Sequence, residues 1–406
     1  MADTQLSSAV ASGGGERHAS WLELFFDLVA VVGVSQLAQL LGDEPGWRDV
    51  GLYVVLYLAF WTNWLSLTLY GNVAGDRTRT RTLLLGMFGL TVMAAAVHGV
   101  QDGELGAAFA IGYVCTRLLG GSVFGDRREI LLDWPTVSFK AGAVPWTVSI
   151  WVHGPARPWL WAAGVVIDLY VTFFFTKNYL LRALQQHRER ADRRGRPASP
   201  ALGAPEPAGS GEVTVARTDS EHLSERLGLF TIIVLGEGVY QLVEAASDAE
   251  WDHRLYSTGI GGFVMLVLVW SLSLRRGRGG IPCLGNALVP PRVLLGLHCL
   301  VTGALAALAA GLGVVVERAH GRLPEQTGYL MATALGVYLL VATVLTHRAD
   351  PGRLPRLLVA AVPALALCAV AAVTDGLHRR PTALAWVLVL AVAWFAAWTH
   401  QGKPPE

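Results

Sequence analysis

The chain has 406 residues, of which 53% are hydrophobic and 16% charged, and its mean hydropathy is +0.43. Soluble domains carry about a quarter charged residues, so this composition excludes an ordinary soluble domain. The formal net charge is +1, nothing in the sequence is typical of nucleic-acid binding, and we expect no nucleic-acid partner.

Apolar segments recur along the whole chain. One helical crossing of a bilayer needs roughly 20 apolar residues. Such windows occur at 22–41, 50–70, 83–100, 106–124, 134–152, 159–181, 227–246, 255–274, 293–316, 327–346, 357–373 and 382–398. They predict an all-α fold, a polytopic transmembrane helix bundle of about twelve spans.

A hydrophilic segment at 182–219 divides these windows into two equal groups. It begins with a basic run and continues with prolines among Ala, Gly and Ser, a composition typical of disordered linkers. We predict a first six-helix half at 21–181, a disordered cytoplasmic linker at 182–219 and a second six-helix half at 220–399. The ends, 1–20 and 400–406, are expected to be a disordered cytoplasmic N-terminus and a short tail. No internal sequence match relates the two halves.

The distribution of Lys and Arg predicts the orientation, because positive residues collect in the loops that stay cytoplasmic. With both termini inside, the cytoplasmic segments hold 21 Lys and Arg residues and the opposite loops hold 7. We therefore predict a multi-pass protein of the cell (plasma) membrane with both termini cytoplasmic and the lipid bilayer as a partner. The N-terminal segment lacks the features of a cleaved signal peptide, so the first helix is expected to remain as a signal anchor.

The cysteines are scattered along the chain, at Cys115, Cys283, Cys299 and Cys368. They form no C-x-x-C pair, and the predicted topology places none at the outer face, where a disulfide could persist. We expect no disulfide, no metal site and no cofactor. Arginine far outnumbers lysine, which suggests a GC-rich bacterial genome.

Two segments carry a family resemblance. The first reads SWLELFFDLV at 20–29 and continues as VSQLA at 34–38, and the second reads HLSERLGLFTIIVLGE at 222–237. Both are similar to the strongest motifs of the bacterial low-temperature-requirement A family, although Leu227 stands where an aromatic residue is usual. The resemblance covers residues 17–246 well and the last third only as generic apolar helices.

The chain departs from the family pattern after Tyr70 and Asn72. There the family continues with an arginine, an aromatic residue and an acidic cluster, whereas this chain reads VAGD at 73–76. If that cluster binds a ligand in relatives, this protein has lost or altered the site. The resemblance implies an integral membrane protein, and the family name records a cold-growth phenotype rather than a reaction.

Three charged residues are predicted near the middle of the membrane: Arg117, Asp168 and Glu237. Each lies about ten residues inside its window, or about 15 Å at the helical rise per residue. Charges at this depth are costly unless paired or hydrated. We expect Arg117 to neutralise Asp168 or Glu237, which leaves the other carboxylate as a proton or cation site. A purely structural ion pair is the alternative.

Gly236 and Gly238 flank Glu237. Glycines beside a midplane acid permit a close backbone approach, or a locally unwound helix that exposes carbonyl groups to an ion. They equally serve plain helix packing. The sequence leaves both interpretations open.

Two further carboxylates lie near the predicted cytoplasmic surface, Glu23 and Asp27. They share one face of the first helix, where two anions repel each other unless a cation, a metal or a proton intervenes. Glu23 follows Ser20 in the S-x-x-E pattern of a capping box, which is a sufficient structural reason for an acid there. Asp27 lies one turn deeper, and no cap explains it.

The seventh window begins with a similar pattern at Thr218, which places His222, Glu225 and Arg226 near the same surface. We expect Asp27 and Arg226 to pair across helices, with His222 titrating near neutral pH. Interfacial anchoring of these charges is the alternative. A metal site from His222 and Glu225 lacks a third ligand, so none is predicted.

The remaining aromatic and histidine residues receive structural interpretations. The tryptophans, among them Trp61 and Trp64, mostly bracket the predicted spans, as interfacial belts do, and are assigned to no cofactor. His298, alone within an apolar window, is interpreted as a hydrogen-bonded packing residue.

Three functions are compatible with these residues. The favoured one is a transporter of a small solute or ion, with proton coupling, that uses the acids named above. The second is an intramembrane enzyme acting on a lipid or hydrophobic metabolite through Asp27 and His222, but no nucleophile elbow, phosphate loop or H-E-x-x-H motif occurs. The third is a non-catalytic membrane stress-response component that binds a partner through its linker. A homo-oligomer is left open.

Overall fold

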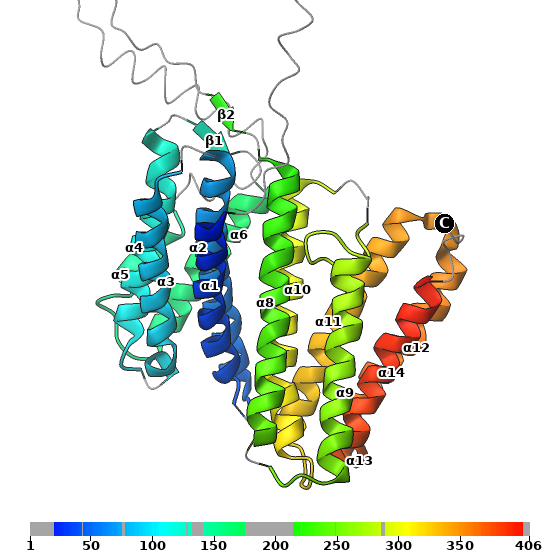
Figure 1. The fold of residues 1–406 in the computed structure, drawn as a ribbon. Coiled ribbons are helices and arrows are strands. Elements are labelled where there is room, and N and C mark those ends of the chain that lie inside the picture. Colours follow the sequence, from blue (N-terminus) through cyan, green and yellow to red (C-terminus); the bar gives the residue numbers. More distant parts are fainter. Residues whose placement is uncertain are drawn as a thin grey trace, which may run out of the picture.

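The computed structural model describes residues 20–42, 44–74, 78–101, 103–126, 129–131, 141–174, 214–216, 218–247, 249–285 and 289–400 (Figure 1). Most of these residues lie in helices of one bundle. The predicted N-terminal segment up to residue 19, most of the predicted linker and residues 401–406 lie outside the described residues.

The first part of the chain forms helices in the order of the first six windows. They are α1 (Trp21–Gln39), α2 (Trp47–Ala74), α3 (Thr80–Gln101), α4 (Gly106–Asp126), α5 (Ala143–Val148) and α6 (Ala156–Phe174). The fifth window, 134–152, is described only from residue 141 and contains the short α5.

The second part of the chain forms helices in the order of the last six windows. They are α8 (Ser220–Ser247), α9 (His253–Trp270), the π-helical turn η3 (Ser271–Arg275), α10 (Pro291–Glu317), α11 (Glu325–Ala349), the 3-10 turn η4 (Pro351–Arg353), α12 (Leu354–Val373), α13 (Asp375–His378) and α14 (Pro381–His400). Of these, α9 and η3 together cover the eighth window.

Among the described residues, 9 helices are long and apolar enough to cross a membrane. They span Trp21–Gln39, Trp47–Ala74, Thr80–Gln101, Ser220–Ser247, His253–Arg275, Pro291–Glu317, Glu325–Ala349, Pro351–Val373 and Pro381–Thr399, and Gly106–Gly120 is a shorter apolar helix. The predicted polytopic helix bundle is confirmed. The number of spans and the division into six-helix halves stay predictions.

Helix contacts follow the same order in the two parts of the chain. In the first, α1 packs on α3, α3 on α4, α4 on α5 and α5 on α6. In the second, α8 packs on α10, α10 on α11, α11 on α12 and α12 on α14. The two parts meet at the centre of the bundle, where α1 and α2 contact α8 and α10 (Figure 1).

One small sheet ties the two parts together at one end of the bundle. Strand β1 (Glu129–Leu131) follows α4, and β2 (Thr214–Ala216) precedes α8. They pair in parallel, with Glu129 opposite Thr214 and Leu131 opposite Ala216. The prediction assigned 214–216 to an unstructured linker, and this is wrong for these three residues. A β-branched pair, Thr214 and Val215, favours an extended backbone there.

Candidate functional site

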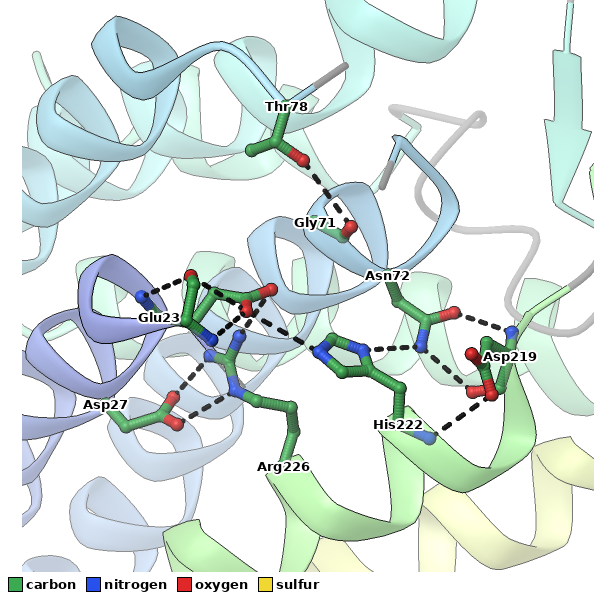
Figure 2. A network of polar contacts seen from close by, with 9 residues as sticks. Glu23, Asp27, Gly71, Asn72, Thr78, Asp219, His222 and Arg226 are labelled. Carbon is green, nitrogen blue, oxygen red and sulfur yellow. Dashed lines mark hydrogen bonds and ion pairs between the residues drawn. The ribbon is translucent and has the colours of Figure 1, made fainter. Parts of the chain in front are cut away.

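Charged side chains of α1 and α8 meet near the starts of both helices (Figure 2). Arg226 donates from Nε to Asp27 Oδ2 at 2.9 Å and from Nη2 to Asp27 Oδ1 at 2.6 Å. On α2, Trp64 donates its indole N–H to the same Oδ1 at 2.9 Å. A two-pronged guanidinium contact to a carboxylate is among the strongest hydrogen-bonded ion pairs. The structure thus places the predicted Asp27 and Arg226 partners in direct contact.

Glu23 serves both as a helix cap and as a charge partner. Its carboxylate accepts hydrogen bonds from the backbone N–H and the hydroxyl of Ser20, which completes the predicted capping box. Its Oε1 lies 3.1 Å from Arg226 Nη1, and its Oε2 lies 3.5 Å from His222 Nε2. Glu23 therefore belongs to the ion network as well as to the end of its helix.

Asn72 of α2 orients the ring of His222. Its amide N–H donates to the carbonyl of Asp219 at 2.9 Å, and its amide oxygen accepts the backbone N–H of Asp219 at 2.9 Å. These two bonds orient the amide, so its nitrogen faces His222 Nδ1 at 3.1 Å as a donor. His222 Nδ1 is then an acceptor, and the ring proton lies on Nε2, facing Glu23.

These residues form one buried unit. We call Glu23, Asp27, Trp64, Asn72, His222 and Arg226 the α1/α8 network. Each of them is at most 4% exposed. Glu23 and His222 are the third residues of their helices, and Asp27 and Arg226 are the seventh. The first helices of the two parts of the chain therefore present acids and bases at matching positions.

Aromatic rings enclose the network on its apolar side. The ring of Phe26 lies 5.8 Å from the guanidinium carbon of Arg226, and Trp64 packs on Phe230 with 4.2 Å between ring centres. Trp64 and Trp61 are buried inside the bundle, so neither belongs to the interfacial belts that the tryptophans mostly form in the prediction. Enclosure of this kind lowers the local dielectric and strengthens each ion pair.

His298 on α10 lies next to these rings. Trp61 donates its indole N–H to His298 Nδ1 at 3.3 Å, and His298 Nε2 lies 3.0 Å from the carbonyl oxygen of Leu227. Both ring nitrogens are therefore occupied by hydrogen bonds within the protein. This geometry agrees with the interpretation of His298 as a packing residue.

A second buried ion pair joins α4 to α6. Arg117 donates from Nη2 to Asp168 Oδ2 at 3.0 Å and from Nη1 to the Ser66 hydroxyl at 3.0 Å. Tyr113 donates its hydroxyl to the same Asp168 oxygen at 3.2 Å. Arg117 therefore pairs with Asp168, one of the two partners that the sequence allowed.

Glu237 lies apart from that pair, on the central helix α8. Its Oε1 accepts a hydrogen bond of 2.7 Å from Gln241, one turn further along the same helix. The side chain is buried, at 4% exposure. The three charges predicted at one depth therefore separate into an ion pair and a carboxylate that lies outside it.

Of the two glycines beside Glu237, one serves helix packing. Helix α8 is continuous from Ser220 to Ser247, so the locally unwound helix that the sequence left open is not present. A side chain at Gly238 would lie 2.8 Å from the side chain of Leu266 on α9, whereas one at Gly236 would meet nothing within 4 Å. Only Gly238 is required for close helix contact.

The start of α8 differs by one residue from the prediction. Asp219, not Thr218, caps the helix, because its side chain accepts the backbone N–H groups of Glu221 and His222 at 3.0 and 3.2 Å. Glu225 is half-buried. Within the described residues, no group of three His, Cys, Asp or Glu side chains is placed to hold a metal ion.

A cavity of about 510 Å³ opens at the opposite ends of α1 and α8, against α10. Small residues line part of the cavity. Its polar lining consists of the side chains Gln39, Gln241, Glu244 and Glu317. Glu237 precedes Gln241 by one turn of α8. It lies 11 residues, or about 16 Å, from Arg226 along the same helix. Buried apolar side chains fill the interval between the cavity and the network, among them Ala30, Val34 and Val234.

Several partners in these sites were not predicted as such. Asn72, Trp64, Ser66 and Tyr113 each bond to a charged or titratable side chain. Polar and aromatic residues inside an apolar window are the available signal, since an unpaired polar group in hydrocarbon is costly. Which charge each of them meets depends on helix packing and cannot be obtained from spacing.

Comparison with known proteins adds a family match over nearly the whole chain. The profile of the bacterial low temperature requirement A protein (LtrA) family matches residues 18–396. The chain is also 26% identical over 273 residues to an uncharacterized protein of Rhizobium meliloti (strain 1021), a match that covers 65% of this chain and 60% of that relative. No solved structure matches the chain.

Proposed function

The chain belongs to the bacterial low temperature requirement A family, and from that premise we propose that this multi-pass membrane protein transports a small solute or an ion. The proposal places it in the plasma membrane with both termini cytoplasmic, as the bias of Lys and Arg predicts. The start of α8, both strands and the end of α14 lie at one end of the bundle, as that topology requires (Figure 1).

One observation carries the proposal. The central helices α1 and α8 hold an open polar cavity at one end and a buried ion network at the other. Neither feature improves the packing of two apolar helices. Buried charges are costly in a membrane, and a cavity lowers the packing density of the bundle. A route for a solute needs both a hydrated opening and a closed end.

The arrangement of the two parts supports alternating access. Many transporters move one helical repeat against another around a central site. Here α1 and α2 belong to the first part, α8 and α10 belong to the second, and the network crosses between them. Separation of Asp27 from Arg226 would open the end that is closed in this structure.

Transport is tested with the full chain in proteoliposomes on a solid-supported membrane, exposed in turn to inorganic cations, amines and amino acids. We expect charge displacement for at least one solute. The variant Gly313→Leu fills the cavity and should abolish the signal, because a side chain at 313 meets Gln241 at 3.0 Å. Gly336→Leu on α11 is the control, since an added side chain there meets nothing within 4 Å. A signal that survives Gly313→Leu would contradict the proposal.

The geometry gives less support to an intramembrane enzyme. Asp27 is engaged by Arg226 and Trp64, and His222 is held between Asn72 and Glu23. The cavity described above is not lined by either residue. A general acid or base must reach its substrate within hydrogen-bond distance.

A further inference from the structure

The hydrogen bonds around His222 have a defined direction. The amide of Asn72 donates to the carbonyl of Asp219 and accepts from its backbone N–H, so a turned amide would place like groups against each other. The amide nitrogen therefore faces His222 Nδ1 as a donor, at 3.1 Å (Figure 2). A proton on Nδ1 would bring two donors face to face. The arrangement in this structure therefore requires a neutral ring.

The other ring nitrogen faces a carboxylate. His222 Nε2 lies 3.5 Å from Glu23 Oε2, and the two residues are 1% and 3% exposed. Opposite charges attract each other more strongly in such a buried environment than in water. A positive ring would therefore have a counter-ion in place, and the amide of Asn72 is what opposes its protonation.

Other titratable and charged groups lie on the elements around His222. They are Glu23 and Asp27 on α1, Tyr70 on α2, Asp219, Glu225 and Arg226 at the start of α8, His298 on α10, and Arg275 and Arg278 at the end of α9 and η3. The hydroxyl of Tyr70 is bonded to the backbone of Arg79, and His298 is bonded to the carbonyl of Leu227. Glu23 approaches the ring of His222 directly.

We propose that His222 is a proton-binding site that controls the closed end of the bundle, an inference that rests on the proposed transport function. A proton from water at that end adds to the lone pair of Nδ1, and the Asn72 amide must leave for this to happen. Its departure breaks the hydrogen bonds from Asn72 to His222 and Asp219, which join α2 to the start of α8. Proton uptake and the separation of α2 from α8 therefore favour each other, and the proton is the coupling ion.

The test follows the distance between α2 and α8 in the purified full chain in detergent. Spin labels are attached at Arg79→Cys and Glu221→Cys after the native cysteines have been replaced by alanine. Both positions are exposed, and the backbone N–H of Arg79 is bonded to the Tyr70 hydroxyl of α2. Histidine changes charge between about pH 8 and 5. Over that range we expect a second, longer distance to appear, its ratio to the short one rising by about tenfold per pH unit for one coupled proton.

Variants assign the response to His222. His222→Asn should remove it, because an asparagine oxygen accepts from the Asn72 amide but takes up no proton in this range. His347→Asn, the same change at an exposed histidine near the end of α11, should keep it. Asn72→Ala removes the donor that opposes the second proton, so the distance should no longer depend on pH. This variant keeps the test decisive if His222→Asn fails to fold.

The proposal is overturned if the wild-type distance is the same at about pH 8 and 5. It is also overturned if His222→Asn or Asn72→Ala keeps the pH response, or if His347→Asn loses it. These outcomes are distinguishable from failure of the transport function. A pH-dependent distance without flux of any solute would contradict transport and leave the proton site intact, whereas flux with a constant distance would contradict the proton site alone.

Discussion

The desolvation of the buried Asp27 carboxylate is offset by hydrogen bonds from its neighbours. Asp27 accepts two hydrogen bonds from Arg226 and one from Trp64, and its side chain is fully buried. Buried pairs of this kind are costly to form and more costly to break, because removal of one partner leaves the other charge without compensation. The pair therefore stabilises one register of packing between α1 and α8.

A double-mutant cycle at this pair measures that dependence. Asp27→Asn and Arg226→Gln should each lower the free energy of unfolding, whereas the double variant should lose less than the sum, with a coupling energy of about 0.5–3 kcal/mol. Denaturant unfolding in detergent gives the four values. The control cycle uses the exposed pair Arg322 and Asp375, separated by 2.6 Å, whose coupling should be about 0–1 kcal/mol. Additive effects at Asp27 and Arg226 would contradict the importance of the pair.

Residue-level prediction from the sequence succeeded where local rules apply. The Ser20 and Glu23 capping box depends on spacing within one helix turn, and the structure contains it. The separation of Glu237 from Arg117 could not be predicted, because equal depth in the membrane does not say which helices are neighbours. Helix neighbours follow from side-chain packing between distant segments.

At the scale of elements, helix ends outside the apolar spans are stabilised by polar caps. Asp252 caps α9 by accepting the backbone N–H groups of Arg254 and Leu255, each at 2.9 Å. His320, from the segment after α10, approaches the same carboxylate at 3.0 Å. The cap thus also links two neighbouring loops of the second part.

These contacts make the cap dependent on pH. The backbone N–H of Leu255, followed by His320 and Arg254, lowers the pKa of Asp252 from 3.8 to about 2. A lowered pKa stabilises the folded state above 3.8, and this contribution is lost as the pH falls through about 2. Asp252→Asn keeps a capping oxygen but no charge, so its unfolding midpoint should lose the wild-type pH dependence in that window. An unchanged pH profile would mean that the cap charge contributes nothing.

Most helices could be predicted because long apolar runs leave few alternatives in a membrane. The β1 and β2 pair could not, since three-residue strands carry little periodicity and their partners lie far apart in the chain. The start of α8 was displaced by one residue because Thr218 and Asp219 are both good caps, and only the contacts of Asp219 distinguish them.

At the scale of the whole molecule, the two parts share one order of helix contacts without a recognisable sequence repeat. The same pattern of helix contacts can be formed by different residues, because apolar residues of similar volume can substitute for one another in a core. The interface between the parts includes α1, α2, α8 and α10, the small sheet, and a hydrogen bond from Arg292 of α10 to the carbonyl of Thr172 of α6. This interface predicts that the parts stay associated without a covalent connection.

That prediction can be tested by inserting a protease site after position 200, within the predicted linker. After cleavage of the purified full chain, both fragments should copurify through a tag on one of them. The Asp27→Asn and Arg226→Gln double variant should weaken this association, whereas a change at the exposed Glu221 should not. Fragments that separate immediately would mean that the linker, not the interface, holds the parts together.

The network has a consequence for biosynthesis. Asp27 and its partner Arg226 are 199 residues apart in the chain. At synthesis rates of about 5–20 residues per second, α1 is complete about 10–40 s before its counter-charge exists. During that time two carboxylates of the first helix, Glu23 and Asp27, have no arginine to meet from α8. The ion pair that joins the two parts can therefore form only after the start of the second part has been synthesised.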